Sequence, residues 1–130
     1  MPLGNLSPCR STVPDTQTVR GVWTGGGAAA NCTKAATDVS KGIASVNYNA
    51  ATGKYLITFT DVGSAILDGE VNIMRPAGTA PLQANVVFGS LDRSAKTLQF
   101  EVWDTATPSL TAVALTDKLC ITVVFSKNGP

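Results

Sequence analysis

The chain has 130 residues, of which 44% are hydrophobic and only 15% are charged, and it contains no histidine. Ten Lys and Arg residues offset nine Asp and Glu residues, and no block of like charges occurs. This composition argues against nucleic-acid binding and against a polybasic membrane anchor, because both need clustered cations. The absence of histidine excludes Ser-His-Asp and Cys-His catalysis. A surface this poor in charge favours packing against copies of the chain or against a partner.

Residues 1–16 are predicted to form an extended N-terminal arm, and residues 17–130 a single β domain. The arm contains Pro2, Pro8 and Pro14 and has no periodic apolar pattern. Proline fixes φ and removes a backbone donor, so a helix or a central strand is disfavoured here. Two interpretations stay open, a disordered tail and an arm that extends over a neighbouring subunit. We expect no signal peptide, because no basic start precedes an apolar run.

The first strand is predicted over residues 18–23, and it runs into a glycine triplet at residues 25–27. Three consecutive glycines predict a flexible turn, since they weaken a strand interior. The following segment, residues 31–41, has a capping residue, an Ala-rich middle and then Gly42. This pattern predicts one short helix.

A β-hairpin is predicted where clear alternation of apolar and polar residues begins. One face carries Ala44, Val46 and Tyr48 on the first strand and Tyr55, Ile57 and Phe59 on the second. Period-two alternation indicates one buried and one solvated face. The loop between the strands ends at Gly53, which is typical of a turn closed by a left-handed residue.

Further strands are predicted over residues 65–74, 85–88, 98–103, 111–115 and 119–125, with loops between them. Gly69, inside the first of these, is expected to mark a β-bulge. The last strand places Leu119, Ile121, Val123 and Phe125 on one face. The chain also contains 13 Val, 5 Ile and 16 Thr, the β-branched residues that suit a pleated surface. We therefore predict an all-β fold, an antiparallel β-sandwich or jelly-roll-like barrel of seven to eight short strands.

The residues that carry chemistry give no catalytic, cofactor-binding or metal-binding prediction. The three cysteines, Cys9, Cys32 and Cys120, are odd in number and lack a CxxC spacing, so we expect reduced thiols. Most carboxylates fall at strand ends or turns, where Asp accepts local hydrogen bonds. Asp68 and Glu70, with Asp61 nearby, form the one oxygen-rich combination that would suit Ca²⁺, although no recognised calcium loop is present. Surface roles are favoured for all three.

Trp23 and Trp103 are the candidate interface residues. Exposed tryptophans anchor interfaces or stack on sugar rings, and the alternative is packing in the core or at a sheet edge. Trp103 falls on the polar face of its predicted strand beside Glu101 and Gln99. This position favours an exposed side chain and hence an interface.

The segment SVNYNAATGKYLITFTDVGSAILDGEVNIMRPAGTAP (residues 45–81) and the ending LCITVVFS resemble small structural proteins of tailed bacteriophage virions. The nearest class is the capsid decoration, or cement, proteins, which are short, β-rich and free of cofactors. The resemblance implies a non-enzymatic protein on the outer capsid surface, assembled in the host cytoplasm as a trimer or similar cluster. Its implied partners are the major capsid protein and copies of itself, with no nucleic acid, membrane or small-molecule substrate.

A second function class stays open, a receptor- or carbohydrate-binding β-sandwich such as a tail-fibre tip domain. For that class the candidate site is Trp103 with Asp104, because sugar sites combine an aromatic ring with carboxylate or amide groups. An enzyme is disfavoured by the missing acid–base residues.

Overall fold

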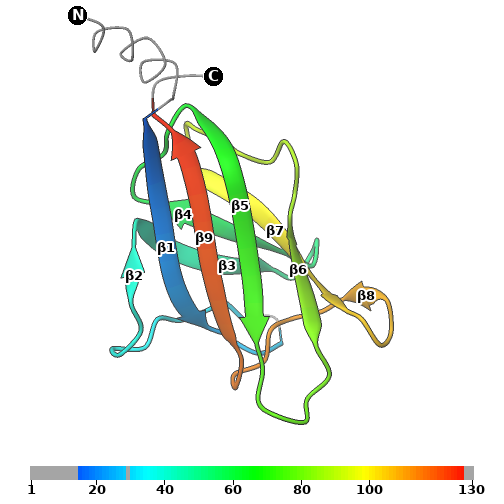
Figure 1. Ribbon diagram of the computed structural model, residues 1–130. Helices are drawn as coiled ribbons and strands as arrows, with labels where there is room; N and C mark the ends of the chain where they lie inside the picture. The colour runs from blue at the N-terminus through cyan, green and yellow to red at the C-terminus, as the bar shows by residue number, and fades with distance from the viewer. Residues whose placement is uncertain (1–14, 29, 128–130) are drawn as a thin grey trace, which may run out of the picture.

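A computed structural model describes residues 15–28 and 30–127, which form an all-β structure (Figure 1). The strands are β1 (Thr16–Thr24), β2 (Ser40–Lys41), β3 (Ile43–Asn49), β4 (Lys54–Phe59), β5 (Ala65–Met74), β6 (Leu82–Val86), β7 (Thr97–Asp104), β8 (Ser109–Leu110) and β9 (Lys118–Ser126). The arm predicted over residues 1–16 lies outside the described residues as far as residue 14. Its last residue, Thr16, already begins β1.

The strands pair antiparallel in two sheets that pack face to face as a sandwich. The first, the β1 sheet, has the order β2-β1-β9-β5, and the second, the β4 sheet, has the order β3-β4-β7-β6 with β8 paired to β7. In Figure 1 the β1 sheet lies in front, and its strands cross those of the β4 sheet behind it. The prediction of an antiparallel all-β fold is confirmed, and of its two alternatives the sandwich is correct.

The core lies between the sheets and is built by alternate residues of each long strand. In β9 the four predicted inward residues, from Leu119 to Phe125, are at most 1% exposed. Phe125 meets Phe59 of β4 edge to face, with 5.2 Å between ring centroids. Tyr55 stacks on Phe100 of β7 at 4.9 Å. Each such side chain contributes about 1.5–3 kcal/mol when fully buried, so these rings are a main source of stability.

Two β-bulges shift residues away from their predicted positions. The hairpin of β3 and β4 is confirmed, with Gly53 at a φ of 71°. A register shift between Ile43 and Ser45 places Ile43 inside and leaves Ala44 exposed, so the predicted inward position of Ala44 is wrong. A bulge adds one residue to a strand and thereby reverses its alternation.

The bulge in β5 lies between Ile66 and Asp68, and the prediction of a bulge at Gly69 is wrong. Gly69 pairs in regular register with Val123 of β9. A methyl group at this position would lie 3.4 Å from the Cγ2 atom of Val86. A methyl group would therefore just touch the Val86 side chain, and no close approach of backbone requires glycine at this position.

The helix predicted over residues 31–41 is wrong, because this segment pairs with strands instead. Thr33 forms an isolated β-bridge with Thr24, with backbone N–O distances of 2.6 and 2.9 Å. The Asn31 side chain, expected to cap a helix, accepts a hydrogen bond of 2.8 Å from the Tyr48 N–H. The helix propensity of a few alanines is too weak to compete with such tertiary hydrogen bonds.

The glycine triplet forms a loop, as predicted, but flexibility is not its main requirement. A Cβ atom on Gly25 would overlap the carbonyl oxygen of Ala114, and one on Gly26 would overlap that of Asn31. These two positions therefore need glycine because backbone segments touch there.

The strand predicted over residues 111–115 is also wrong, since only its first residue bonds to a neighbouring strand, where the Thr111 N–H donates to the Val102 carbonyl of β7 at 2.9 Å. The next N–H groups bind side chains. The Val113 N–H donates to the Tyr55 hydroxyl at 2.7 Å. The Ala114 N–H donates to Asp117 Oδ2 at 3.1 Å. Regular pairing in this region is limited to the two residues of β8.

Replacing Tyr55 tests how much its hydrogen bond to the Val113 N–H contributes to the stability of the fold. Tyr55→Phe removes the acceptor of the buried Val113 N–H, and we expect the free energy of unfolding to fall by about 1–3 kcal/mol. Chemical denaturation measures this change. Tyr48→Phe is the matched control, because the Tyr48 hydroxyl forms no hydrogen bond with the described residues. Equal losses in the two variants would contradict the role assigned to the Tyr55 hydroxyl.

Candidate functional site

The two tryptophans occupy different environments and form no common site. Trp23 lies on the inner face of β1, is 7% exposed and donates from Nε1 to Ser40 Oγ at 3.1 Å. Its side chain therefore belongs to the core, and little of it is accessible to a partner. Trp103 lies on the outer face of β7, is partly exposed and donates to Glu101 Oε1 at 3.4 Å. An interface role for either residue stays a prediction.

A buried ion pair closes the end of the sandwich where β9 begins. Asp117 is fully buried, and both of its carboxylate oxygens lie 3.2 Å from Arg75 Nε. The same carboxylate accepts the Ala114 N–H described above. Sequence reasoning placed Asp117 in an ordinary turn, because no local pattern links it to an arginine so far away in the chain. The pair joins two loops and is a structural element.

A second polar cluster lies beside it, around Lys118. The Lys118 ammonium donates to Thr24 Oγ1 at 2.7 Å and to both oxygens of Asp38 at 3.0 Å. Asp38 also accepts the Ala35 N–H at 3.0 Å. These bonds tie the segment before β2 to the ends of β1 and β9, which again indicates a structural role.

The remaining candidate ligands do not converge on a metal site. Asp68 and Glu70 share the outer face of β5, as predicted. Within residues 15–28 and 30–127, no three Asp, Glu, Cys or His side chains group closely enough to hold a metal ion. Cys32 and Cys120 are free thiols, and burial raises the pKa of Cys32 to about 11, which disfavours a reactive thiolate. Cys9 lies outside the described residues.

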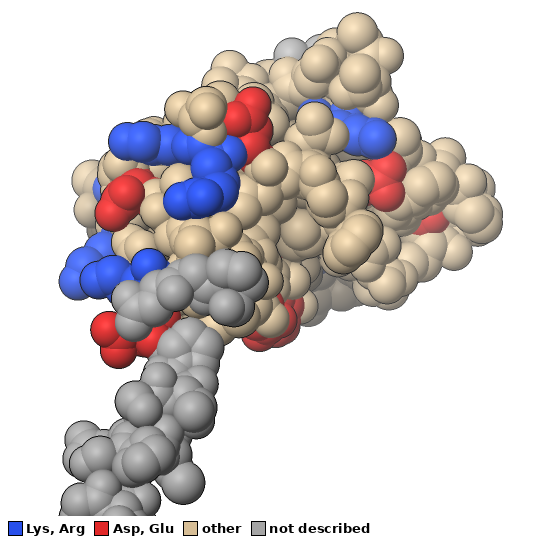
Figure 2. Space-filling model, turned by 90° about the horizontal axis from the view of Figure 1, so that it is seen from above, with Lys and Arg blue, Asp and Glu red and all other residues tan. Residues whose placement is uncertain are grey.

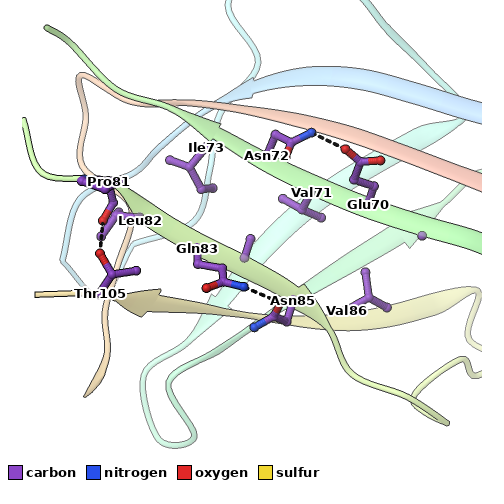
Figure 3. Close-up of a pocket in the computed structure, with 12 residues that line it drawn as sticks. Glu70, Val71, Asn72, Ile73, Pro81, Leu82, Gln83, Asn85, Val86 and Thr105 are labelled. Atoms are coloured by element: carbon purple, nitrogen blue, oxygen red, sulfur yellow. Dashed lines mark hydrogen bonds between the residues drawn. The ribbon is translucent and has the colours of Figure 1, made fainter. Parts of the chain in front are cut away.

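A groove of about 570 Å³ lies between the edge strands β5 and β6 (Figure 3). Its floor is apolar and consists of Val71, Ile73, Leu82, Ala84 and Val86. Its two rims are polar, with Glu70 and Asn72 on β5 and Gln83 and Asn85 on β6. In the described structure β5 pairs only with β9 and β6 only with β7, so each strand turns an unpaired backbone edge toward the groove.

An apolar hollow of about 450 Å³ continues this groove past Val86, which lines both. It lies between Ile66 and the loop that follows β6. Phe88, beside it, is fully exposed. The predicted strand over residues 85–88 runs from Leu82 to Val86 instead, so sequence reasoning placed Phe88 in a strand and missed its exposure. The only local signal was Gly89, which has a φ of 78° and belongs to a turn.

The surface carries few charges and they are scattered. Seen from above in Figure 2, most of the described surface belongs to neither Lys and Arg nor Asp and Glu, and both signs occur among the rest. Comparisons with protein-family models, with curated proteins and with solved structures found no match to this chain. The described residues include no helix with the length and apolar character needed to cross a membrane.

The Lys118 cluster predicts a defined dependence of stability on pH. The hydrogen bond from Lys118 lowers the pKa of Asp38 below its ordinary value of 3.8. Such a carboxylate stabilises the fold above its unfolded pKa, and the contribution is lost as pH falls through the folded pKa. We expect Asp38→Asn to lower the Tm at pH 7 and to flatten the decline of Tm between about pH 5 and pH 2.

Thermal melts followed by circular dichroism across this pH range measure the effect. Asp61→Asn is the matched control, because Asp61 is exposed and forms no ion pair with a described residue. An Asp38→Asn curve that runs parallel to the wild-type curve would refute the assignment.

Proposed function

We propose that this protein is a non-enzymatic structural component of a virus particle that binds the outer surface of a capsid and reinforces it as a small cluster of copies. The proposal combines the resemblance of residues 45–81 to capsid decoration proteins with the open edge of the sandwich. The open edge between β5 and β6 is the observation that carries it, because this edge offers a binding surface that needs no catalytic group.

The groove suits an extended segment of a capsid protein. Free backbone edges bind an added strand through main-chain hydrogen bonds, and pockets on either side select its side chains. Here the amides of Gln83 and Asn85 on one rim and Asn72 on the other supply further donors and acceptors. The apolar floor excludes water from these bonds, which strengthens them.

Reinforcement follows from binding alone. A protein that binds the assembled shell and not its separated subunits stabilises the shell by mass action, in proportion to the logarithm of its free concentration. A rigid sandwich with an apolar core is sufficient for this role. Charge chemistry at the binding surface is not required.

Binding to purified capsids tests the proposal. We expect the double variant Gln83→Arg/Asn85→Arg to bind capsids about tenfold more weakly or worse, because two long cations obstruct the β6 rim. Co-sedimentation with capsids over a range of protein concentrations measures the affinity. The matched control is Asn47→Arg/Asn49→Arg, which places the same groups on exposed positions of β3.

Unchanged binding by the rim variant would remove the groove as the attachment surface. If the wild-type protein does not bind capsids and mass spectrometry does not detect it in purified virions, the virion function itself is refuted.

Carbohydrate binding is the second candidate function, and the position of Trp103 favours it. Trp103 lies beside Gln83 on the outer face of the β4 sheet and is hydrogen-bonded to Glu101. This places an aromatic ring among amide and carboxylate groups, as sugar sites require. Asp104, the expected partner, is instead engaged in its own turn. Its carboxylate accepts the Ala106 N–H at 2.9 Å, and this bond lowers its pKa.

For this candidate, Trp103→Ala is expected to abolish glycan binding, because the stacking surface is lost. A glycan array probed with the labelled full chain gives the measurement. Phe88→Ser, which removes an exposed aromatic ring elsewhere, is the control and is expected to bind normally. If the wild-type protein binds no glycan on the array, this function is excluded.

A further inference from the structure

The outer face of the β1 sheet carries charges of opposite sign on its two sides. The strand register places Lys41, Arg20, Thr122 and Glu70 in one row across β2, β1, β9 and β5. Residues paired across antiparallel strands point to the same side, so the row runs along one face. Two cations thus stand on the β2 and β1 side of this face, and an anion stands on the β5 side.

The adjoining row extends the anionic side. Asp68 lies on the same face of β5, opposite Val124 of β9. All four charged residues, Arg20, Lys41, Asp68 and Glu70, are exposed. The ion pairs of the described chain are Lys54–Glu101, Arg75–Asp117 and Lys118–Asp38. The four charges on this face therefore form no ion pair within the described residues, and about two strand spacings, near 10 Å, separate Arg20 from Glu70.

The middle of the face is uncharged. The next row holds Val22 and Cys120, which pair across β1 and β9. Val39, the residue before β2, lies beside Val22 and accepts the Val22 N–H at 2.9 Å. Val39 is 78% exposed although it is apolar. Arg20, Lys41, Val22, Val39 and Cys120 line a shallow hollow of about 360 Å³. The apolar side chains thus lie beside the cations and on β9, and uncharged residues of β9 separate the cations from the anions of β5.

We propose that this face binds a second copy of the chain across a two-fold axis that runs parallel to β1 and β9. A rotation of 180° about such an axis sets the β2 and β1 side of one copy over β5 of the other. Arg20 and Lys41 then face Asp68 and Glu70, and symmetry repeats these contacts. A two-fold axis across the strands would instead set β5 against β5 and oppose like charges, which is unfavourable.

The dimensions of the sheet fit a weak, specific dimer. The three long strands β1, β9 and β5, about 4.8 Å apart and nine or ten residues long, and the two-residue β2 together cover roughly 460 Å² per copy. The total of about 900 Å² lies just above most crystal contacts and within the size of weak, transient interfaces. Because the charge pairs lie at the rim, salt is expected to weaken the dimer. The inference does not rest on the capsid function, since it concerns a face other than the β6 rim.

Charge reversal on the full chain tests the surface. We expect Arg20→Glu/Lys41→Glu to raise the dimer dissociation constant about tenfold or more, because four anions per copy then oppose one another. Asp68→Lys/Glu70→Lys is expected to do the same with cations. An equimolar mixture of the two variants restores the dimer, since each side again meets the opposite charge. Sedimentation velocity over a concentration series gives the dissociation constants.

The control is Lys54→Glu/Lys96→Glu, which changes the net charge by the same amount. Lys54 lies on β4 and Lys96 in the turn before β7, so this variant is expected to dimerise like the wild type. Labelling of Cys120 with a maleimide in a Cys9→Ser background gives a second readout, because the dimer covers this thiol. Restoration by mixing keeps the test decisive if either variant is less stable alone.

A wild-type chain that stays monomeric at high concentration, or a mixture that fails to associate, would overturn the inference. A trimer would overturn the two-fold arrangement while leaving capsid binding intact. A wild-type chain that dimerises but does not bind capsids would count against the proposed function alone.

Discussion

The pairing of β9 with both β1 and β5 is the interaction on which the rest of the structure depends. β9 forms nine-residue ladders with β1 on one side and with β5 on the other. Its inner face supplies four of the most deeply buried side chains, and Phe125 reaches across the core to Phe59 of the opposite sheet. Without β9 the β1 sheet has no central strand to join β1 to β5, and the β4 sheet loses its most deeply buried packing partners.

Outside the ladders, side chains take over the hydrogen bonding of the backbone. Tyr55 accepts from Val113, Asp117 accepts from Ala114, and Asp38 accepts from Ala35. Buried backbone groups need partners, and a side chain can supply one where no strand is adjacent. The acidic residues that sequence reasoning assigned to turns therefore include two that organise the interior. The surface is left with few charges and is suited to contacts with other molecules.

Period-two alternation predicted the strands well because it reports directly on burial. The inward faces of β4, β7 and β9 followed from apolar residues at every second position. The same rule failed at Ala44, where a bulge adds a residue that no local pattern announces. It also failed at residues 111–115, where hydrogen bonds to the Tyr55 and Asp117 side chains replace a strand ladder at Val113 and Ala114. The helix expected over residues 31–41 failed for the same reason, since its competing partners come from other strands.

The candidate surfaces were less predictable than the fold. Trp103 was placed correctly on an outer face, but Trp23 is in the core, because only the register shows which side of β1 turns inward. The groove between β5 and β6 requires knowing which strands end up at sheet edges, and this depends on topology. The opposed charges on the β1 sheet come from four strands, and only the register of all four places Lys41, Arg20, Thr122 and Glu70 in line.

The central position of β9 also has a consequence for how the chain acquires its structure during synthesis. β1 is made first, yet its main ladder partner is made only when residues 118–126 leave the ribosome. The β3–β4 hairpin, whose strands are separated by a short loop, can pair long before that. Until β9 is made, β1 and β5 have no strand between them to pair with. Pairing across so many residues of sequence is also slow. The nascent chain therefore exposes unpaired strand edges and apolar faces for most of its synthesis. Its folding is expected to depend on whether these strands stay apart from other chains until β9 is made.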